Sequence, residues 1–184
     1  DRCLSRGLGD VYKRQEKANK IHHVGAIQSE YSLSTRFPEL GLLQKTKQLE
    51  TAFVAFSPVG RGLLTDKPPS PERVKESPFL SINPRFQEPN LSENIKAVKG
   101  FQKLAKDYQL STAGLAIAWL LAKDEHIIPI PGTRSTSHLK EMIKGAEKKL
   151  SQSDLLAIEK TIPVGWAHGD RYSDIQWIGP EKYC

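Results

Sequence analysis

The sequence predicts an α/β fold built around a parallel sheet. Three short apolar runs have the composition of buried strands, and they cover residues 24–29, 51–56 and 127–130. Helical patterns follow each run, so strands and helices alternate along the chain. This alternation is typical of units in which parallel strands are joined by crossover helices.

The helices are predicted from apolar spacing and from capping residues. Ser92 is predicted to cap a long helix that carries a single apolar stripe, and Ser151 with Asp154 matches the capping-box pattern. A connection rich in Pro and Gly runs over residues 60–91, and loops of this length are usually functional or mobile. The predicted helices cover residues 37–49, 92–108, 111–121, 137–148 and 151–159.

The run HIIPIPGTRSTSHLK, residues 126–140, carries the strongest functional signal. A strand ends there at a Pro131-Gly132 turn, and Arg134 with several hydroxyl side chains precedes the next helix. Backbone N–H groups at a helix start attract anions, and arginine adds a two-pronged phosphate contact. The run therefore predicts a phosphate site, although an ordinary capped turn between strand and helix has the same pattern.

This run resembles the adenosine-phosphate loop of the aldo-keto reductases, and further blocks of the chain resemble the same family in the same order. AIQSEYSL resembles the sixth barrel strand, and VAFSPVGRGLL resembles the seventh strand with its cofactor loop. NPRF and GDRY resemble loop motifs of one family branch. These blocks occupy residues 26–33, 54–64, 83–86 and 169–172.

The resemblance implies that the chain is the C-terminal part, about the last three βα units, of a (β/α)8 TIM barrel. With 184 residues the chain is short for a whole barrel, which typically needs about 250. Residues 17–184 would form a partial aldo-keto reductase domain, the NADP-binding C-terminal half. Residues 1–15 look foreign because they lack a sustained apolar period and do not match the family. We therefore predict a foreign or disordered tail over residues 1–16.

The resemblance also implies a cofactor, NADP, and the residues that hold it. Gln28 would bond the nicotinamide carboxamide and Phe56 would stack on the ring; without the family, a solvated polar residue and a core aromatic are the alternatives. An arginine beside the 2′-phosphate favours NADP over NAD, whereas His138 and Met142 depart from the residues that many relatives carry. The predicted cofactor-binding residues are Gln28, Phe56, Ser57, Pro58, Val59, Arg61, Gly132, Thr133, Arg134 and His138.

The family reduces aldehydes or ketones with NADPH, so the intact parent is expected to take a small-molecule carbonyl substrate. Its catalytic Tyr, Lys, Asp and His come from the first four strand-helix units. No tyrosine of this chain matches that context, so no catalytic residue is assigned and the chain alone is expected to be inactive. A non-catalytic, cofactor-binding regulatory subunit of the same fold is the alternative.

The composition and the charge pattern argue against several other functions. The net charge of +6 is spread among acidic residues without a block of like charges, so no nucleic-acid partner is expected. No apolar run reaches the roughly 18 residues of a membrane span, and His22-His23 lacks further ligands for a metal. The two cysteines, Cys3 and Cys184, suggest a reducing, cytoplasmic setting. The oligomeric state is not predicted.

Overall fold

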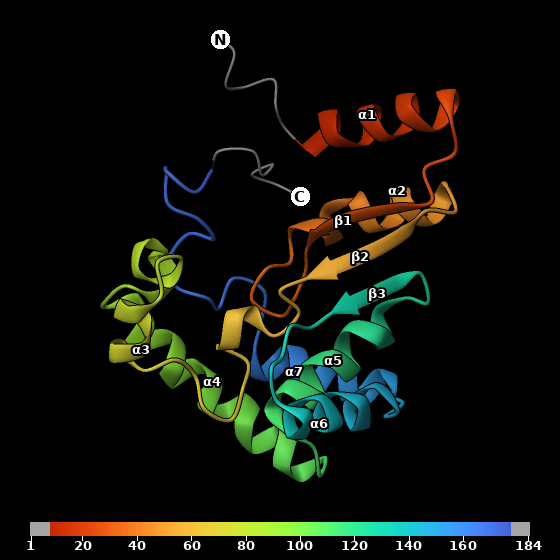
Figure 1. The fold of residues 1–184 in the computed structure, drawn as a ribbon. Helices are drawn as coiled ribbons and strands as arrows, with labels where there is room; N and C mark the ends of the chain where they lie inside the picture. The colour runs from red at the N-terminus through yellow and green to blue at the C-terminus, as the bar shows by residue number, and fades with distance from the viewer. Residues whose placement is uncertain (1–7, 178–184) are drawn as a thin grey trace.

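The structure is a computed structural model that describes residues 8–177, with three strands and seven α-helices in the described part (Figure 1). The strands are β1 (Ala26–Glu30), β2 (Ala52–Phe56) and β3 (Ile127–Ile130). The helices are α1 (Leu8–Ile21), α2 (Leu42–Gln48), α3 (Pro71–Glu76), α4 (Asn90–Asp107), α5 (Thr112–Lys123), α6 (Thr136–Ala146) and α7 (Gln152–Thr161).

The three strands form one parallel sheet in the order β1-β2-β3. Gln28 pairs with Val54 across the first interface, and Phe56 pairs with Ile130 across the second. The predicted strands are confirmed, with β3 over its predicted residues and β1 shifted by two residues at its start. Because the strands are parallel, their carboxyl ends meet at one edge of the sheet.

The two faces of the sheet differ in their surroundings. Phe53, Ala55 and Ile127 are buried against helical side chains, among which the indole of Trp119 is fully buried. In Figure 1, α5, α6 and α7 gather on one side of the sheet. Side chains alternate along a strand, so the next residues of β3 point to the other face, where Ile128 and Ile130 are 49% and 44% exposed. One face is therefore a core layer, and the other has an open apolar surface.

Several helix starts follow from serine caps. Ser111 Oγ accepts a hydrogen bond from Gly114 N–H at the start of α5, and Ser135 Oγ accepts from His138 N–H at α6. The predicted capping box of Ser151 and Asp154 is present at α7. Such side-chain oxygens satisfy N–H groups that the helix itself leaves without partners.

Two predicted helix boundaries were wrong. The helix predicted over residues 37–49 is split at Gly41, whose φ of 129° separates a 3-10 turn from α2. The predicted cap Ser92 lies inside α4, which begins at Asn90 after Pro89. The helix boundary is therefore set by Gly41 in the first case and by Pro89 in the second, and not by the apolar spacing.

The connection predicted over residues 60–91 carries its own short helices. It contains α3 and three 3-10 turns, over residues 60–62, 80–82 and 84–86. Together with the first turn of α4 it encloses a small separate core of Leu63, Val74, Phe86 and Leu91. The connection is thus packed on its own apolar side chains.

The structure also bears on the predicted tail. Helix α1 begins at Leu8, so residues 8–16 of the predicted foreign or disordered tail are helical. Glu16 of α1 forms an ion pair with Lys45 of α2 at 2.5 Å. That the segment is foreign to the protein stays a prediction, and residues 1–7 lie outside the described part.

Within residues 8–177, no helix has both the length and the apolar character that crossing a membrane requires.

Candidate functional site

The predicted site residues follow the strands toward one edge of the sheet. Phe56 is the last residue of β2, and Gln28 lies two residues before the end of β1 rather than at its end. Both side chains share the open face of the sheet, where Gln28 is exposed and Phe56 half-buried. Phe56 pairs with Ile130, so the loops after β2 and β3 leave the sheet from neighbouring strand ends.

The loop Ser57–Gly62 is tightly wound. Ser57, Gly60, Arg61 and Gly62 all have positive φ values, between 51° and 97°. Gly60 N–H donates to Ser57 O at 2.9 Å, and Gly62 N–H donates to Val59 O at 3.1 Å. A Cβ at Gly60 would lie 2.8 Å from Ser34 Oγ, so glycine is needed there for space as well as for φ. Ser57 and Arg61 are not glycines, so contacts with neighbouring residues must hold their left-handed backbone conformations in place.

The turn after β3 presents an arginine to solvent. Thr133 Oγ1 accepts a hydrogen bond from Ser135 N–H at 3.1 Å, and Ser135 caps α6. Arg134 and His138 are exposed, and the Arg134 guanidinium has no polar partner within residues 8–177. Gly132 is exposed, and a Cβ added there would meet open space. The turn thus offers a free guanidinium beside the first turn of an 11-residue helix.

These observations test whether the residues present fit a phosphorylated nucleotide. The free guanidinium of Arg134 and the N–H groups at the start of α6 match the donor set that a phosphate requires. Gln28 adds an exposed amide, and Phe56 adds a half-buried ring, on the open face of the adjoining strands. The guanidinium and the helix N–H groups thus fit a phosphate, and the amide and the ring lie on the open face of neighbouring strands.

Met142 of α6 is buried, with 6% of its surface exposed.

A buried charged cluster lies at the end of β1, and sequence reasoning did not assign it. Glu30 is 1% exposed, and Arg61 donates to its two carboxylate oxygens at 3.0 and 2.7 Å. Thr35 Oγ1 donates to Glu30 Oε1 at 3.0 Å and accepts from Arg85 Nη1 at 2.7 Å. Tyr172 OH accepts a further hydrogen bond from Arg61 at 2.7 Å. These five residues are called the Glu30 cluster below.

The cluster holds more positive than negative charge in a buried space. Burial lowers the pKa of Arg85 to about 10; the nearby Glu30 opposes this shift, while Arg61 and Arg171 add to it. Arg171 is 2% exposed, and its Nε lies 4.0 Å from Glu30 Oε2. Glu30 therefore lies beside the guanidinium groups of Arg61 and Arg171, and Arg85 is linked to it through Thr35.

The two motifs NPRF and GDRY, which carry no predicted role, contact each other in the structure. Asn83 Nδ2 donates to Arg171 O at 2.7 Å, and a Cβ at Gly169 would lie 2.7 Å from Pro84 O. Asn94 of α4 is fully buried and exchanges two hydrogen bonds with the backbone of His168, at 2.9 and 2.7 Å. The C-terminal segment is thus fixed against the connection, beside the Glu30 cluster.

One signal could have indicated Glu30 from sequence. A carboxylate at the end of a buried strand needs a cationic partner, and both loop motifs and the Ser57–Gly62 loop contain arginine. These arginines are 31 to 141 positions away from Glu30 in the chain, so no local spacing joins them.

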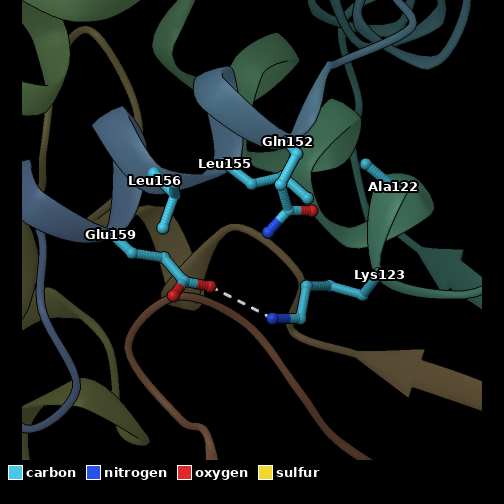
Figure 2. A pocket seen from close by; sticks show the side chains of 6 residues that line it. All are labelled: Ala122, Lys123, Gln152, Leu155, Leu156 and Glu159. Carbon is cyan, nitrogen blue, oxygen red and sulfur yellow. Dashed lines mark hydrogen bonds and ion pairs between the residues drawn. The ribbon is translucent and has the colours of Figure 1, made fainter.

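A small pocket lies apart from these residues, between α5 and α7 (Figure 2). Its volume is about 210 Å³, and it is lined by Ala122, Lys123, Gln152, Leu155, Leu156 and Glu159. Lys123 Nζ forms an ion pair with Glu159 Oε1 at 3.0 Å across it, as the dashed line in Figure 2 shows. No predicted cofactor residue lines the pocket, and it is smaller than the few hundred Å³ typical of ligand sites.

Three tyrosines, Tyr31, Tyr108 and Tyr172, have partners of their own. Tyr31 is fully buried and donates to Glu39 at 2.7 Å, and burial together with that carboxylate raises its pKa. Tyr108 donates to Asp154 at 2.6 Å, and this hydrogen bond raises the pKa of Tyr108 to about 12. Tyr172 belongs to the Glu30 cluster. No group of three or more potential metal ligands occurs between Leu8 and Trp177.

Comparison with known proteins gives one family. The sequence model of the aldo/keto reductase family matches residues 9–163. The chain is 37% identical over 169 residues to "Probable aldo-keto reductase 1" of Glycine max, and covers 48% of that protein. It is 32% identical over 159 residues to "Aldo-keto reductase yakc [NADP(+)]" of Schizosaccharomyces pombe, and covers 47% of it. The two alignments take in 92% and 85% of this chain, which spans about half the length of these relatives.

Solved structures give the same fold. The glycerol dehydrogenase AKR11B4 from Gluconobacter oxydans superposes with a TM-score of 0.70 at 22% identity, over 81% of this chain and 45% of that one. The thermostable aldo-keto reductase Tm1743, solved with the inhibitor epalrestat, gives 0.53 at 25% identity, over 74% and 39%. The predicted fold class is confirmed, because the parallel sheet and its helices are part of an aldo-keto reductase barrel. The chain belongs to the aldo/keto reductase family.

Proposed function

We propose that this chain is the C-terminal part of an NADPH-dependent oxidoreductase that reduces an aldehyde or ketone to an alcohol. In this proposal the chain supplies the cofactor-binding loops, and the catalytic residues come from the rest of the protein. The observation that carries it is Arg134, an exposed and unpaired guanidinium at the first turn of α6. The printed name of the Schizosaccharomyces pombe relative, which includes NADP(+), supports the same cofactor.

The residues of this chain would bind and orient the cofactor. Arg134 and the N–H groups that begin α6 hold the 2′-phosphate, with Gly132, Thr133 and His138 around it. The amide of Gln28 bonds the carboxamide, and the Phe56 ring covers one face of the nicotinamide. Ser57, Pro58, Val59 and Arg61 form the loop beside the pyrophosphate. NADPH itself supplies the hydride when it is bound.

The described tyrosines support the proposal that the proton donor lies elsewhere in the protein. A general acid must reach the developing alkoxide, and Tyr31, Tyr108 and Tyr172 are each committed to a charged partner. We therefore propose that the chain alone binds the cofactor without reducing a carbonyl.

The test is a fluorescence titration of the 184-residue chain with NADPH and, separately, with NADH. We expect the variant Arg134→Gln to weaken NADPH binding about tenfold, which is the usual effect of losing one charge-assisted contact. NADH lacks the 2′-phosphate, so its dissociation constant should stay the same in this variant.

Arg73→Gln is the matched control, because Arg73 is an exposed arginine of α3 with no side-chain partner in the described part of the chain. It should bind both nucleotides as the unsubstituted chain does. An equal loss for NADPH and NADH in Arg134→Gln would contradict the phosphate role, and failure of the chain to bind either nucleotide would contradict the proposed cofactor site.

A further inference from the structure

The Glu30 cluster has a feature that a purely structural ion pair does not require: it joins a strand end to the loop Ser57–Gly62. Glu30 is at the carboxyl end of β1, and its side chain is fully buried. Arg61 is inside the loop, with a left-handed backbone of φ 54°. The two-pronged contact between them therefore fixes the orientation of a residue whose backbone conformation is intrinsically unfavourable.

Aromatic rings and the C-terminal segment hold Arg61 from its other sides. The guanidinium carbon lies 4.7 Å from the centre of the Phe79 ring and 4.9 Å from that of Tyr172. The Tyr172 hydroxyl accepts a hydrogen bond from Arg61 Nη2 at 2.7 Å, and the Arg61 side chain is 13% exposed. The guanidinium thus has hydrogen bonds in its plane and rings within cation–π distance.

Three parts of the chain that are far apart in sequence meet at this side chain. They are the end of β1, the connection that contains Phe79, and the C-terminal segment that contains Tyr172. Buried ion pairs contribute little net stability, because removing two charges from water offsets their attraction. Their clearer effect is to select one arrangement among several, and here that arrangement is the wound form of the loop.

We propose that Glu30 is a positioning residue that holds the loop Ser57–Gly62 in its binding conformation, acting through Arg61, with Tyr172 completing the contact. The inference rests on the proposed function, because the loop is the predicted neighbour of the NADPH pyrophosphate. In this arrangement the Arg61 side chain supports the loop from behind, since three of its N–H groups donate to Glu30 and Tyr172. The surface of the loop then remains for the cofactor.

The first readout is limited trypsin cleavage of the full chain well below its unfolding temperature. Trypsin cuts after arginine only where the backbone can leave its fold, so the Arg61–Gly62 bond reports on the loop. Glu30→Gln removes the charge and keeps the size, and we expect cleavage at this bond to accelerate about tenfold relative to the other sites. A rise in parallel at all sites would mean global destabilisation and would overturn the proposal.

Glu39→Gln is the matched control. Glu39 accepts two hydrogen bonds from Arg36, both at 2.7 Å, in a comparable two-pronged pair that lies outside the Glu30 cluster. It should leave the relative rate at Arg61–Gly62 unchanged. Tyr172→Phe removes a single hydroxyl and provides a milder variant if Glu30→Gln does not fold; it should accelerate the same cleavage by a smaller factor, and an unchanged rate would count against the proposal.

The second readout is a double-mutant cycle on the dissociation constant for NADPH. Glu30→Gln should weaken binding about tenfold on its own, and by less than about twofold when Arg61→Gln is already present. Independent, additive losses would overturn the claim that Glu30 acts through Arg61. If the unsubstituted chain fails to bind NADPH, the proposed function is contradicted, and the selectivity of trypsin cleavage alone then decides whether Glu30 holds the loop.

Discussion

At the scale of single residues, the pKa of Asp124 depends on side chains from other parts of the chain. Its Oδ2 lies 2.7 Å from Lys47 Nζ, and its Oδ1 lies 3.0 Å from His126 Nδ1. Burial alone would raise the pKa of Asp124, but hydrogen bonds from Lys47 and His126 lower it to about 2, against 3.8 ordinarily. The carboxylate therefore joins α5 to the end of α2 as long as it is charged.

The first prediction concerns the acid stability of the chain. Because the pKa of Asp124 is lower in the folded state, its contribution is present above about pH 4 and is lost as the pH falls toward 2. Asp124→Asn should reduce the loss of unfolding free energy between these pH values, measured by urea denaturation. Asp107→Asn is the control, since Asp107 is exposed and has no partner among residues 8–177; an equal effect of both variants would contradict the assignment.

Residue-scale chemistry could be predicted only where it follows a local pattern. Phe56 and Arg134 lie where the strand ends and the helix start predict them, because their positions depend on adjacent residues. Glu30 was missed because its partners come from three other segments of the chain. A local pattern can say that a buried carboxylate needs a cation, but only the fold says which arginine it meets.

At the scale of elements, α5 and α6 pack with their backbones in contact. Gly114 in α5 faces Gly145 in α6, and a Cβ added at Gly145 would overlap the carbonyl group of Gly114. In Figure 1 the two helices lie beside each other below β3. Since the overlapping atoms belong to the backbone, a larger side chain cannot be accommodated by changing a rotamer.

Gly145→Ala should therefore separate the helices and destabilise the chain. We expect a loss of about 3 kcal/mol in the free energy of unfolding, at the upper end of the usual range for overpacking. The matched control is Gly25→Ala, because a Cβ at Gly25 meets nothing within 4 Å and should change stability by less than about 0.5 kcal/mol. Thermal unfolding of both variants compares them directly, and similar midpoints would argue against a tight helix contact.

Sequence patterns predicted which elements exist better than they predicted element ends or contacts. Strand β3 and the capping box of α7 were predicted because apolar runs and serine caps are local signals. The break at Gly41 was missed because the apolar spacing continues across it. The close approach at Gly145 could not be predicted either. A glycine inside a helix lowers helix propensity, and by itself it does not show that another helix packs against it.

At the scale of the whole molecule, the dominant feature is a sheet covered on one side. Ile128 and Ile130 on the open face are 49% and 44% exposed, and β1 and β3 are both edge strands. An apolar sheet face with unpaired edges is a template for association with another chain. In the proposed intact protein the remaining strands of the barrel would cover this face.

We therefore expect the 184-residue chain to self-associate, with the open face as the contact. The double variant Ile128→Thr with Ile130→Thr keeps β-branched side chains and removes apolar surface. It should therefore raise the dissociation constant for self-association about tenfold. Leu156→Ser is the control, because Leu156 is exposed on α7, away from the sheet face. Sedimentation velocity over a concentration series measures both. If Leu156→Ser lowered association as strongly as the sheet variant did, general surface hydrophobicity would be the cause, and the open face would lose its assigned role.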